Sequence, residues 1–252
     1  MTPTFTDKVV LVSGGGSGIG RGTARAFAQH GATVVVAGRN AGRLDETVTL
    51  IERDGGTASS VVADVARSED AAQMVATAVE RHGSLDVAFN NAGAHAAGPL
   101  ADIDDDDWAR LIATNTTGVF HAMKHEIRHM REHGGGAIVN MASNIGAHMR
   151  LPYLGAYAAS KAAVSALTAN AALEYIGQGI RINSVSPGPI ETPMSLLPGE
   201  SEDERAERLK TALPIGRAGT LDEVAAAVLW LASPASGFVV GHDMVIDGGA
   251  SA

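Results

Sequence analysis

Short apolar segments alternate with longer amphipathic segments along most of this chain. The first apolar segment, Lys8–Ser13, contains the run Val-Val-Leu-Val, as expected of a strand buried on both faces of a sheet. The next segment, Ile19–His30, has the apolar spacing of a helix and stops before Gly31, a residue suited to a helix C-terminus. This alternation predicts strand–helix–strand units around a parallel sheet.

The same alternation continues to the end of the chain. It predicts further strands at Thr33–Ala37, Ser60–Ala63, Val87–Asn90, Ala137–Met141, Arg181–Ser186 and Met244–Ile246. It predicts further helices at Leu44–Asp54, Ser68–His82 (with Ser68 as N-cap), Asp105–His133, Tyr157–Ile176 and Leu221–Leu231. A segment rich in Glu and Arg, Thr192–Leu213, is expected to form a lid-like insert. We find no linker or repeat, so residues 1–252 are expected to form a single α/β domain.

Composition narrows the class of protein. Of 252 residues, 45% are apolar and 19% are charged, as in an ordinary globular protein. A net charge of −9 without a basic stripe argues against nucleic acid and membrane surfaces as partners. The absence of cysteine excludes disulfides and thiolate catalysis. The polar amino terminus, Met1–Lys8, lacks a signal-peptide pattern, and no apolar run reaches the roughly 18 residues of a membrane span, so we expect a cytoplasmic protein.

A glycine-rich turn joins the first strand to the first helix. Its sequence is Ser13-Gly14-Gly15-Gly16-Ser17-Gly18-Ile19-Gly20. Glycine permits the tight turn and lets the backbone approach a pyrophosphate, while the helix N-terminus offers free N–H groups to the anion. A turn that is merely flexible would also be rich in glycine. The position between a buried strand and a helix favours a dinucleotide site.

The segment Tyr157-Ala-Ala-Ser-Lys161 carries the candidate chemistry. Helix positions four apart lie on one face, so a Lys161 ammonium would lie beside the Tyr157 phenol. A positive neighbour favours the phenolate and lowers a tyrosine pKa from about 10, which gives a general acid/base usable near neutral pH. Tyr–Lys pairs that are merely solvated on a helix share this spacing. The catalytic interpretation therefore depends on the glycine turn and on a polar loop that ends in Ser143.

Taken together, these motifs resemble the short-chain dehydrogenase/reductase family. The glycine turn, Asn90-Asn91-Ala92-Gly93, the Tyr157–Lys161 pair, Pro187-Gly188 and Asp247-Gly248-Gly249 occur in the family's order and span nearly the whole chain. The resemblance implies a Rossmann-like, doubly wound sheet of seven parallel strands with helices on both faces. It also implies an NAD(P)-dependent oxidoreductase that binds cofactor and substrate at the carboxyl edge of the sheet.

The resemblance implies cofactor contacts from several segments. The expected cofactor-binding residues are Ser13, Gly14, Ser17, Gly18, Ile19, Gly20, Arg39, Asp64, Val65, Asn90, Asn91, Ala92, Gly93, Tyr157, Lys161, Pro187, Gly188, Ile190 and Thr192. The place of the acid that would bind the ribose 2′-hydroxyl is held by Gly38, and Arg39 follows. Because a guanidinium suits a phosphate, we expect NADP(H) to be preferred, with NAD possible. In the alternative, Arg39 only stacks over adenine, and Asp64 is only a loop acid before a helix.

The resemblance also implies four catalytic residues, namely Ser143, Tyr157, Lys161 and Asn115. Ser143 and Tyr157 would hold the substrate oxygen, and Tyr157 would donate its proton as hydride reaches the carbonyl carbon. Lys161 would bind the nicotinamide ribose and lower the Tyr157 pKa, and Asn115 would seat a relay water. No metal is expected.

Substrate identity is not decided by the sequence. The residues expected to shape the pocket are mainly apolar: His95, Asn144, Ile145, Met149, Tyr153, Pro189, Met194, Leu196 and Leu197. They indicate a neutral or hydrophobic ketone or secondary alcohol. Two other classes stay open: a dinucleotide-binding sensor or scaffold without turnover, and a methyltransferase that uses the glycine turn for S-adenosylmethionine.

Other charged and titratable residues are interpreted as surface features. His121, His125, His129 and His133 recur every four residues, and we expect a solvated or subunit-facing surface there rather than a zinc site. The acids at 104–107 favour a helix N-terminus rather than calcium binding. The charged run 200–208 is expected on a solvated side of the lid. The family usually forms tetramers, so a homotetramer is expected.

Overall fold

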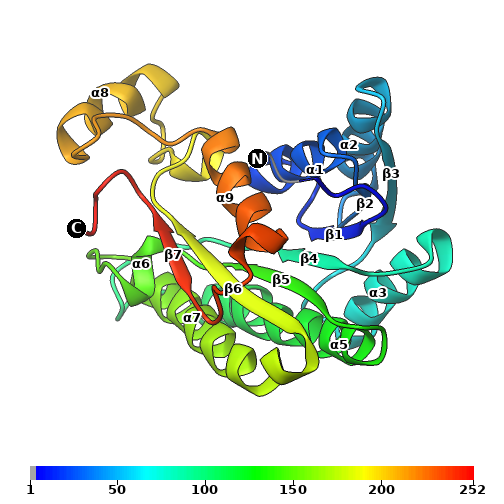
Figure 1. The fold of residues 1–252 in the computed structure, drawn as a ribbon. Coiled ribbons are helices and arrows are strands. Elements are labelled where there is room, and N and C mark those ends of the chain that lie inside the picture. Colours follow the sequence, from blue (N-terminus) through cyan, green and yellow to red (C-terminus); the bar gives the residue numbers. More distant parts are fainter. Residues whose placement is uncertain (1–3) are drawn as a thin grey trace.

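The computed structural model describes residues 4–252; Met1–Pro3, part of the polar amino-terminal stretch, lie outside the described residues. Seven strands form one parallel sheet in the order β3-β2-β1-β4-β5-β6-β7 (Figure 1). The strands are β1 (Val9–Ser13), β2 (Thr33–Gly38), β3 (Thr57–Val62), β4 (Val87–Asn90), β5 (Gly136–Met141), β6 (Ile180–Pro187) and β7 (Asp243–Ile246).

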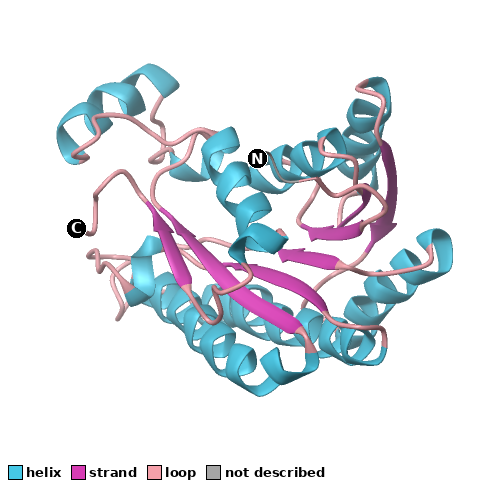
Figure 2. Ribbon diagram, in the orientation of Figure 1, coloured by secondary structure: helices cyan, strands magenta, loops and turns pink. Residues whose placement is uncertain are grey.

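Helices cover both faces of this sheet (Figure 2). One face carries α1 (Gly18–Gln29), α2 (Ala41–Arg53) and α9 (Leu221–Ala232), and the other carries α3 (Ser68–His82), α5 (Gly118–Glu132) and α7 (Gly155–Tyr175). The shorter helices are α4 (Asp105–Leu111), the π-helical turn η1 (Ile112–Thr117), α6 (Asn144–Ala147), η2 (Ile176–Gln178), η3 (Pro193–Ser195), α8 (Glu202–Ala212) and η4 (Pro234–Ser236). Within residues 4–252, no helix is both long and apolar enough to cross a membrane.

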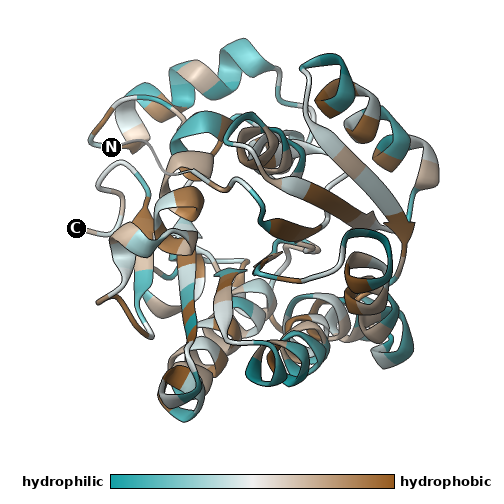
Figure 3. Cartoon of the chain, turned by 45° about the vertical axis from the view of Figure 1, so that its right-hand side comes forward, coloured by the Kyte–Doolittle hydropathy of each residue, from teal (hydrophilic) through white to brown (hydrophobic). Residues whose placement is uncertain are grey.

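Each face of the sheet has its own apolar core. Alternate residues of β1 point to opposite sides, so Val10 and Val12 pack with Phe27 of α1, whereas Val9 and Leu11 pack with the helices of the other face. Figure 3 shows the apolar colour gathered on the central strands and on the inner sides of the helices. The Rossmann-like, doubly wound α/β fold with seven parallel strands is therefore confirmed.

The carboxyl ends of the strands form the edge where a ligand is expected. Chain order reverses between β1 and β4, which are neighbours, and such a reversal leaves a crevice beyond the strand ends. The strands β1, β4, β5 and β6 end at Ser13, Asn90, Met141 and Pro187. All four motif-bearing loops therefore leave the sheet at one edge.

Three local features differ from the sequence prediction, besides shifts of one to three residues at the ends of other elements. The edge strand β3 begins at Thr57, three residues earlier than expected, because its first half is polar and lacks an apolar signal. The helix expected over Asp105–His133 contains the π-helical turn η1. Ser68 is not the N-cap of α3, since Arg67 occupies that position and the Ser68 hydroxyl lies 3.1 Å from the ring of His125 instead.

The histidine row on α5 lies closer to α3 than the sequence indicated. The Nδ1 atom of His121 is 3.3 Å from the carbonyl oxygen of Val65, just before α3, and His125 contacts Ser68. The rings of His129 and His133 stack with centroids 4.0 Å apart. The first two histidines thus link α5 to the start of α3 and are only half-exposed.

The charged run 200–208 of the lid-like insert is mostly exposed, as expected, with one buried exception. Within the charged run of α8, Arg205 is only 7% exposed, and it donates to the carbonyl of Thr192 (3.2 Å) and the hydroxyl of Ser195 (3.2 Å). Arg208 forms an ion pair with Glu200. One side of α8 therefore packs on the segment that follows β6.

Candidate active site

Close backbone approach explains the glycines of the turn after β1. A Cβ added to Gly20 would lie 2.2 Å from the carbonyl oxygen of Gly14, and Gly14 itself has φ +66°. The side-chain amide of Asn91 donates to the carbonyls of Ser13 (3.1 Å) and Gly14 (3.2 Å). Asn91, directly after β4, thereby holds the turn in shape.

The start of α1 is open toward an anion. Its N-cap, Ser17, has extended backbone (φ −165°) and makes no side-chain bond to the first N–H groups of the helix, which are left for a ligand. Two residues that the sequence analysis did not name support the turn from behind. Arg21 donates to the carbonyl of Gly16 (2.6 Å), and Thr47 donates to that of Gly15 (2.9 Å).

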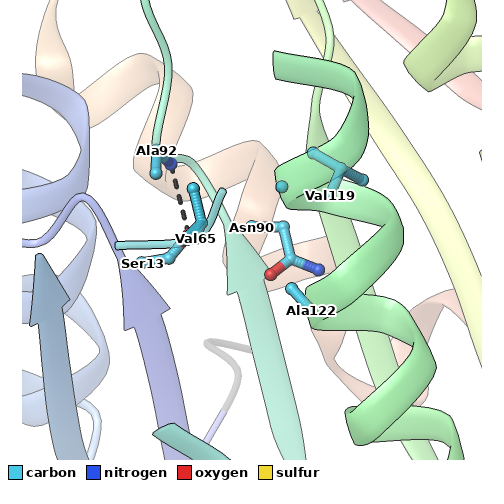
Figure 4. Close-up of a pocket in the computed structure, with 7 residues that line it drawn as sticks. Ser13, Val65, Asn90, Ala92, Val119 and Ala122 are labelled. Atoms are coloured by element: carbon cyan, nitrogen blue, oxygen red, sulfur yellow. Dashed lines mark hydrogen bonds between the residues drawn. The ribbon is translucent and has the colours of Figure 1, made fainter. Parts of the chain in front are cut away.

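The end of β4 is held against β1 by Ser13. The Ser13 hydroxyl accepts hydrogen bonds from the backbone N–H of Asn91 (3.1 Å) and of Ala92 (3.2 Å; Figure 4). The Asn90 side chain lies between β4 and α5, where it donates to Glu126 (2.9 Å) and Asn140 (3.0 Å). The side-chain N–H groups of Asn90 are therefore committed to α5 and β5. The small hollow drawn in Figure 4 is lined by Ser13, Val65, Asn90, Ala92, Gly118, Val119 and Ala122.

The residues expected at the adenosine end lie after β2 and β3. Arg39 is exposed and directly follows β2. The side chain of Asp64 already accepts a hydrogen bond from the N–H of Ala66 (3.0 Å), which also fits its interpretation as a loop acid. Val65 is buried, and its side chain would lie 2.7 Å from a Cβ placed on Gly118.

Asn115 joins the loop after β4 to α7. It is fully buried in the π-helical turn, where its carbonyl accepts from the N–H of Ala94 (2.7 Å) and its amide donates to Ser160 (2.9 Å). A Cβ placed on Gly93 would lie 3.5 Å from the Asn115 carbonyl oxygen and 3.7 Å from Lys161 Nζ. The loop that follows β4 therefore lies next to Lys161 of α7.

Ser143, Tyr157 and Lys161 meet at the carboxyl end of β5. All three are buried, and the Ser143 hydroxyl is close enough to the Tyr157 phenol to lower its pKa. Ser143 also caps α6 by accepting from the N–H of Ile145 (3.2 Å). Lys161 donates to the carbonyl oxygen of Met141, the last residue of β5, at 2.7 Å.

Burial controls the electrostatics of this group. Desolvation raises the pKa of Tyr157, with a smaller opposite effect of the nearby Ser143 hydroxyl. Desolvation also lowers the pKa of Lys161 to about 8. The lowered Tyr157 pKa expected from the sequence is not found in this structure, because burial has the largest effect on the phenol. The Tyr157 phenol keeps its proton at neutral pH and can donate it.

The loop after β6 covers the glycine turn. The N–H of Gly188 donates to the carbonyl of Ile246 in β7 (3.0 Å), which fixes where the loop leaves β6 at Pro187. The carbonyl of Ile190 accepts from the N–H of Thr192 (2.6 Å) and the hydroxyl of Ser195 (2.6 Å). The methyl of Thr192 lies 3.5 Å from where a Cβ on Gly18 would be.

The residues expected to contact substrate differ in exposure and in hydrogen bonding. The His95 ring lies 5.0 Å from the Tyr157 ring, and Tyr153 is 65% exposed with an unusual φ of +68°. Met194 and Leu197 are exposed on the lid segment. The backbone carbonyl of Pro189 accepts from Gly219 (3.0 Å), and Ile145 bridges to Met149. Asn144 differs, since it is buried and its amide donates to Asp247 (3.2 Å).

Glu126 is a buried acid that the sequence pattern did not predict. It is fully buried on α5; one carboxyl oxygen accepts from Asn90, and the other has no hydrogen-bond partner among the described residues. Burial raises its pKa to about 7. The available signal was an acid three residues after Met123 and one before Ile127, on the apolar side of the helix.

Comparisons with known proteins agree with this geometry. The family model described as enoyl-(acyl carrier protein) reductase matches residues 14–251. Cyclohexanol dehydrogenase of Acinetobacter sp. (strain SE19) is 41% identical over 249 residues, covering 98% of this chain and 96% of that protein. Cis-4-hydroxycyclohexanecarboxylate dehydrogenase of Sinomonas cyclohexanicum is 41% identical over 253 residues and 100% of both chains. A short-chain type dehydrogenase/reductase structure from Mycobacterium ulcerans superposes with a TM-score of 0.92 at 32% identity, covering 98% of this chain and 91% of that one.

Proposed function

The chain belongs to the short-chain dehydrogenase/reductase family of oxidoreductases, and from that premise we propose that it interconverts a ketone and a secondary alcohol with NADP(H) as preferred cofactor. The observation that carries this proposal is the buried group of Ser143, Tyr157 and Lys161. The Ser143 hydroxyl is near enough to the Tyr157 phenol to lower its pKa, and the loop of Gly93 lies against Lys161.

The residues of the edge fit a dinucleotide. Backbone takes the place of side chains at Gly14 and Gly20, and the first N–H groups of α1 are free to bind a pyrophosphate. A bound nicotinamide supplies the hydride in reduction and accepts it in oxidation. Residues of the Asn90–Gly93 and Pro187–Thr192 segments would hold it at the edge.

The catalytic roles that we propose assign one task to each side chain. Ser143 donates to the substrate oxygen while Tyr157, whose pKa is raised by burial, gives that oxygen a proton. In oxidation Tyr157 acts as the base. Lys161 binds the ribose hydroxyls and stabilises the phenolate when it forms. Asn115 holds the loop of Ala94 beside Lys161 and seats the relay water.

The Tyr157→Phe variant tests the assignment. We expect it to lose ketone reduction with NADPH by about a thousandfold or more, since the proton donor is removed and the ring is kept. Its NADPH affinity, followed by reduced-nicotinamide fluorescence, should change little. Full activity in this variant would overturn the catalytic assignment, and tight dinucleotide binding without turnover in the wild type would favour a sensor or scaffold.

Arg39 supports the preference for NADP(H). The residue is exposed at the end of β2, where the preceding position, Gly38, carries no acid. A guanidinium there would bind the 2′-phosphate, and an acid would repel it. Arg39→Asp should therefore lower kcat/KM for NADPH relative to NADH by about a hundredfold. An unchanged ratio would contradict this cofactor assignment.

The substrate that we propose is a neutral or hydrophobic alicyclic ketone or secondary alcohol. Exposed apolar side chains of Tyr153, Met194 and Leu197 offer it little charge. Two relatives at 41% identity are named for a hydroxyl group on a cyclohexane ring. A panel of cyclic and linear ketones, assayed with both cofactors, tests this class; preference for linear ketones would refute it.

We also propose a homotetramer in the cytoplasm. Large apolar side chains lie exposed around β7 and the end of α9, and Phe238 is fully exposed. The surrounding residues are Trp230, Val239, Val240, His242 and Met244. Sedimentation of the wild type against Phe238→Asp tests assembly through this surface, and a monomeric wild type would exclude it.

A further inference from the structure

The segment that follows Ser143 is not held by regular secondary structure. Within α6, Ile145 (φ −78°, ψ 109°) and Gly146 (φ 139°, ψ −94°) are not helical. The backbone bonds inside the segment run from Gly146 to Met149 (2.9 Å) and from Met149 to Asn144 (2.7 Å). Because Ser143 caps this short loop, the position of its hydroxyl depends on what fixes residues 144–149.

Two carboxylates from the β7 segment bind this loop from outside. Asp247, directly after β7, accepts from the side-chain amide of Asn144 at 3.2 Å. Asp243, the first residue of β7, accepts from the ring Nε2 of His148 at 2.9 Å. Figure 1 shows α6 beside β7 and the carboxyl terminus, although they are about a hundred residues apart in sequence.

Both carboxylates are themselves fixed by several donors. Asp247 also accepts from the backbone N–H of Gly249 (3.0 Å) and the hydroxyl of Ser251 (2.7 Å). Asp243 accepts from Ser165 on α7 (2.6 Å) and Ser186 on β6 (2.7 Å). These hydrogen bonds lower the pKa of both groups against the opposing effect of burial, so both are ionised at neutral pH and accept charge-assisted bonds.

We propose that Asp243 and Asp247 are positioning residues for Ser143, which hold segment 144–149 so that the Ser143 hydroxyl reaches both Tyr157 and the substrate oxygen. The inference rests on the proposed function, because it assigns a role in the same reaction. Asp247 acts directly on Asn144, the residue after Ser143, and Asp243 fixes the far end of the loop through His148. This clamp accounts for the burial of Asn144, which the sequence had assigned to the substrate.

A double-mutant cycle between Asp247→Asn and Ser143→Ala tests the clamp. Alone, Asp247→Asn should lower kcat about tenfold or more, because a misplaced donor loses its orientation, and leave the NADPH Kd within about twofold. In the Ser143→Ala background the same change should cost less than about twofold. The control is Asp86→Asn, a carboxylate with similar donors before β4, and it should leave kcat unchanged.

An unchanged kcat in Asp247→Asn would overturn the proposal, and so would the full loss repeated in the Ser143→Ala background. If Asp247→Asn does not fold, Asn144→Ala removes the same bond and takes its place in the cycle. Hydrogen exchange at the N–H groups of Gly146 and Met149 gives a readout without turnover, and it should speed up in either variant. A wild type without oxidoreductase activity would refute the proposed function, whereas unchanged exchange would refute the clamp.

Discussion

The buried carboxyl of Glu126 makes the stability of this protein depend on pH in a way that one substitution should remove. Glu126 has no exposed surface, no cation beside it, and one carboxyl oxygen without a hydrogen-bond partner among the described residues. Glu126→Gln keeps the shape and the acceptor for Asn90, and it resembles the neutral acid. The variant should therefore behave like the wild type in which this group is always protonated.

The expected size follows from the pKa of this group. Burial raises it from an ordinary 4.5 to about 7 in the folded protein. At roughly 1.4 kcal/mol per pH unit, that difference corresponds to about 3 kcal/mol of unfolding free energy. The pKa is raised on folding, so this stabilisation is complete below pH 4.5 and is lost as the pH rises through about 7. Glu126→Gln does not ionise, so it keeps this stabilisation as the pH rises.

The assay is urea unfolding of wild type and Glu126→Gln at matched concentration between pH 5 and 8.5. The variant should gain about 3 kcal/mol relative to the wild type across this range, or about 6–12 °C in Tm. The matched control is Glu132→Gln, an exposed acid at the end of the same helix, which should run parallel to the wild type. Parallel curves for Glu126→Gln would refute the inference that a buried, unpaired carboxyl titrates near neutrality.

Three further predictions concern the turn, the lysine and a helix cap. Gly20→Ala should weaken dinucleotide binding about tenfold or more, because its Cβ would lie 2.2 Å from the carbonyl of Gly14. The control is Gly177→Ala, whose Cβ would meet nothing within 4 Å. Unchanged dinucleotide affinity in Gly20→Ala would contradict the role of the glycine turn in binding. The rate of reduction should fall above about pH 8 as Lys161 loses its proton, and a pH profile flat to pH 10 would exclude that role. Thr220→Ala breaks a capping box at the start of α9 and should cost about 1 kcal/mol in urea unfolding, whereas no loss would show that the cap contributes nothing.

Local pattern was a good guide wherever a segment is buried in a regular way. The central strand β4 and the helix α3 begin and end where the sequence placed them, because their apolar spacing is uninterrupted. The edge strand β3 was found only in part, since its half-exposed residues include Ser59 and Ser60 and carry no apolar alternation. The π-helical turn around Asn115 was missed, since the Asn115 side chain there bonds to the distant loop of Ala94, a contact that no local pattern reveals.

The candidate site also has features that the sequence predicted and features that it did not. The spacing of the glycine turn and of the Tyr157–Lys161 pair is set by neighbours in the chain, so the sequence identified the residues that the structure brings to one edge. It gave the wrong direction for the Tyr157 pKa, because burial depends on every segment that covers the phenol. The sequence by itself thus determined the fold class and the candidate residues. Both depend on turn geometry and apolar periodicity, which act over a few neighbouring positions.

Only the tertiary structure decided which groups are desolvated and what orients them. Glu126 and Asp247 illustrate this point, since each owes its environment to residues far away in sequence, Asn90 for the first and Asn144 for the second. Hydrogen bonds and dielectric surroundings are properties of the packed molecule. No local pattern carries them, and for this chain they decide where protons reside and how the serine is held.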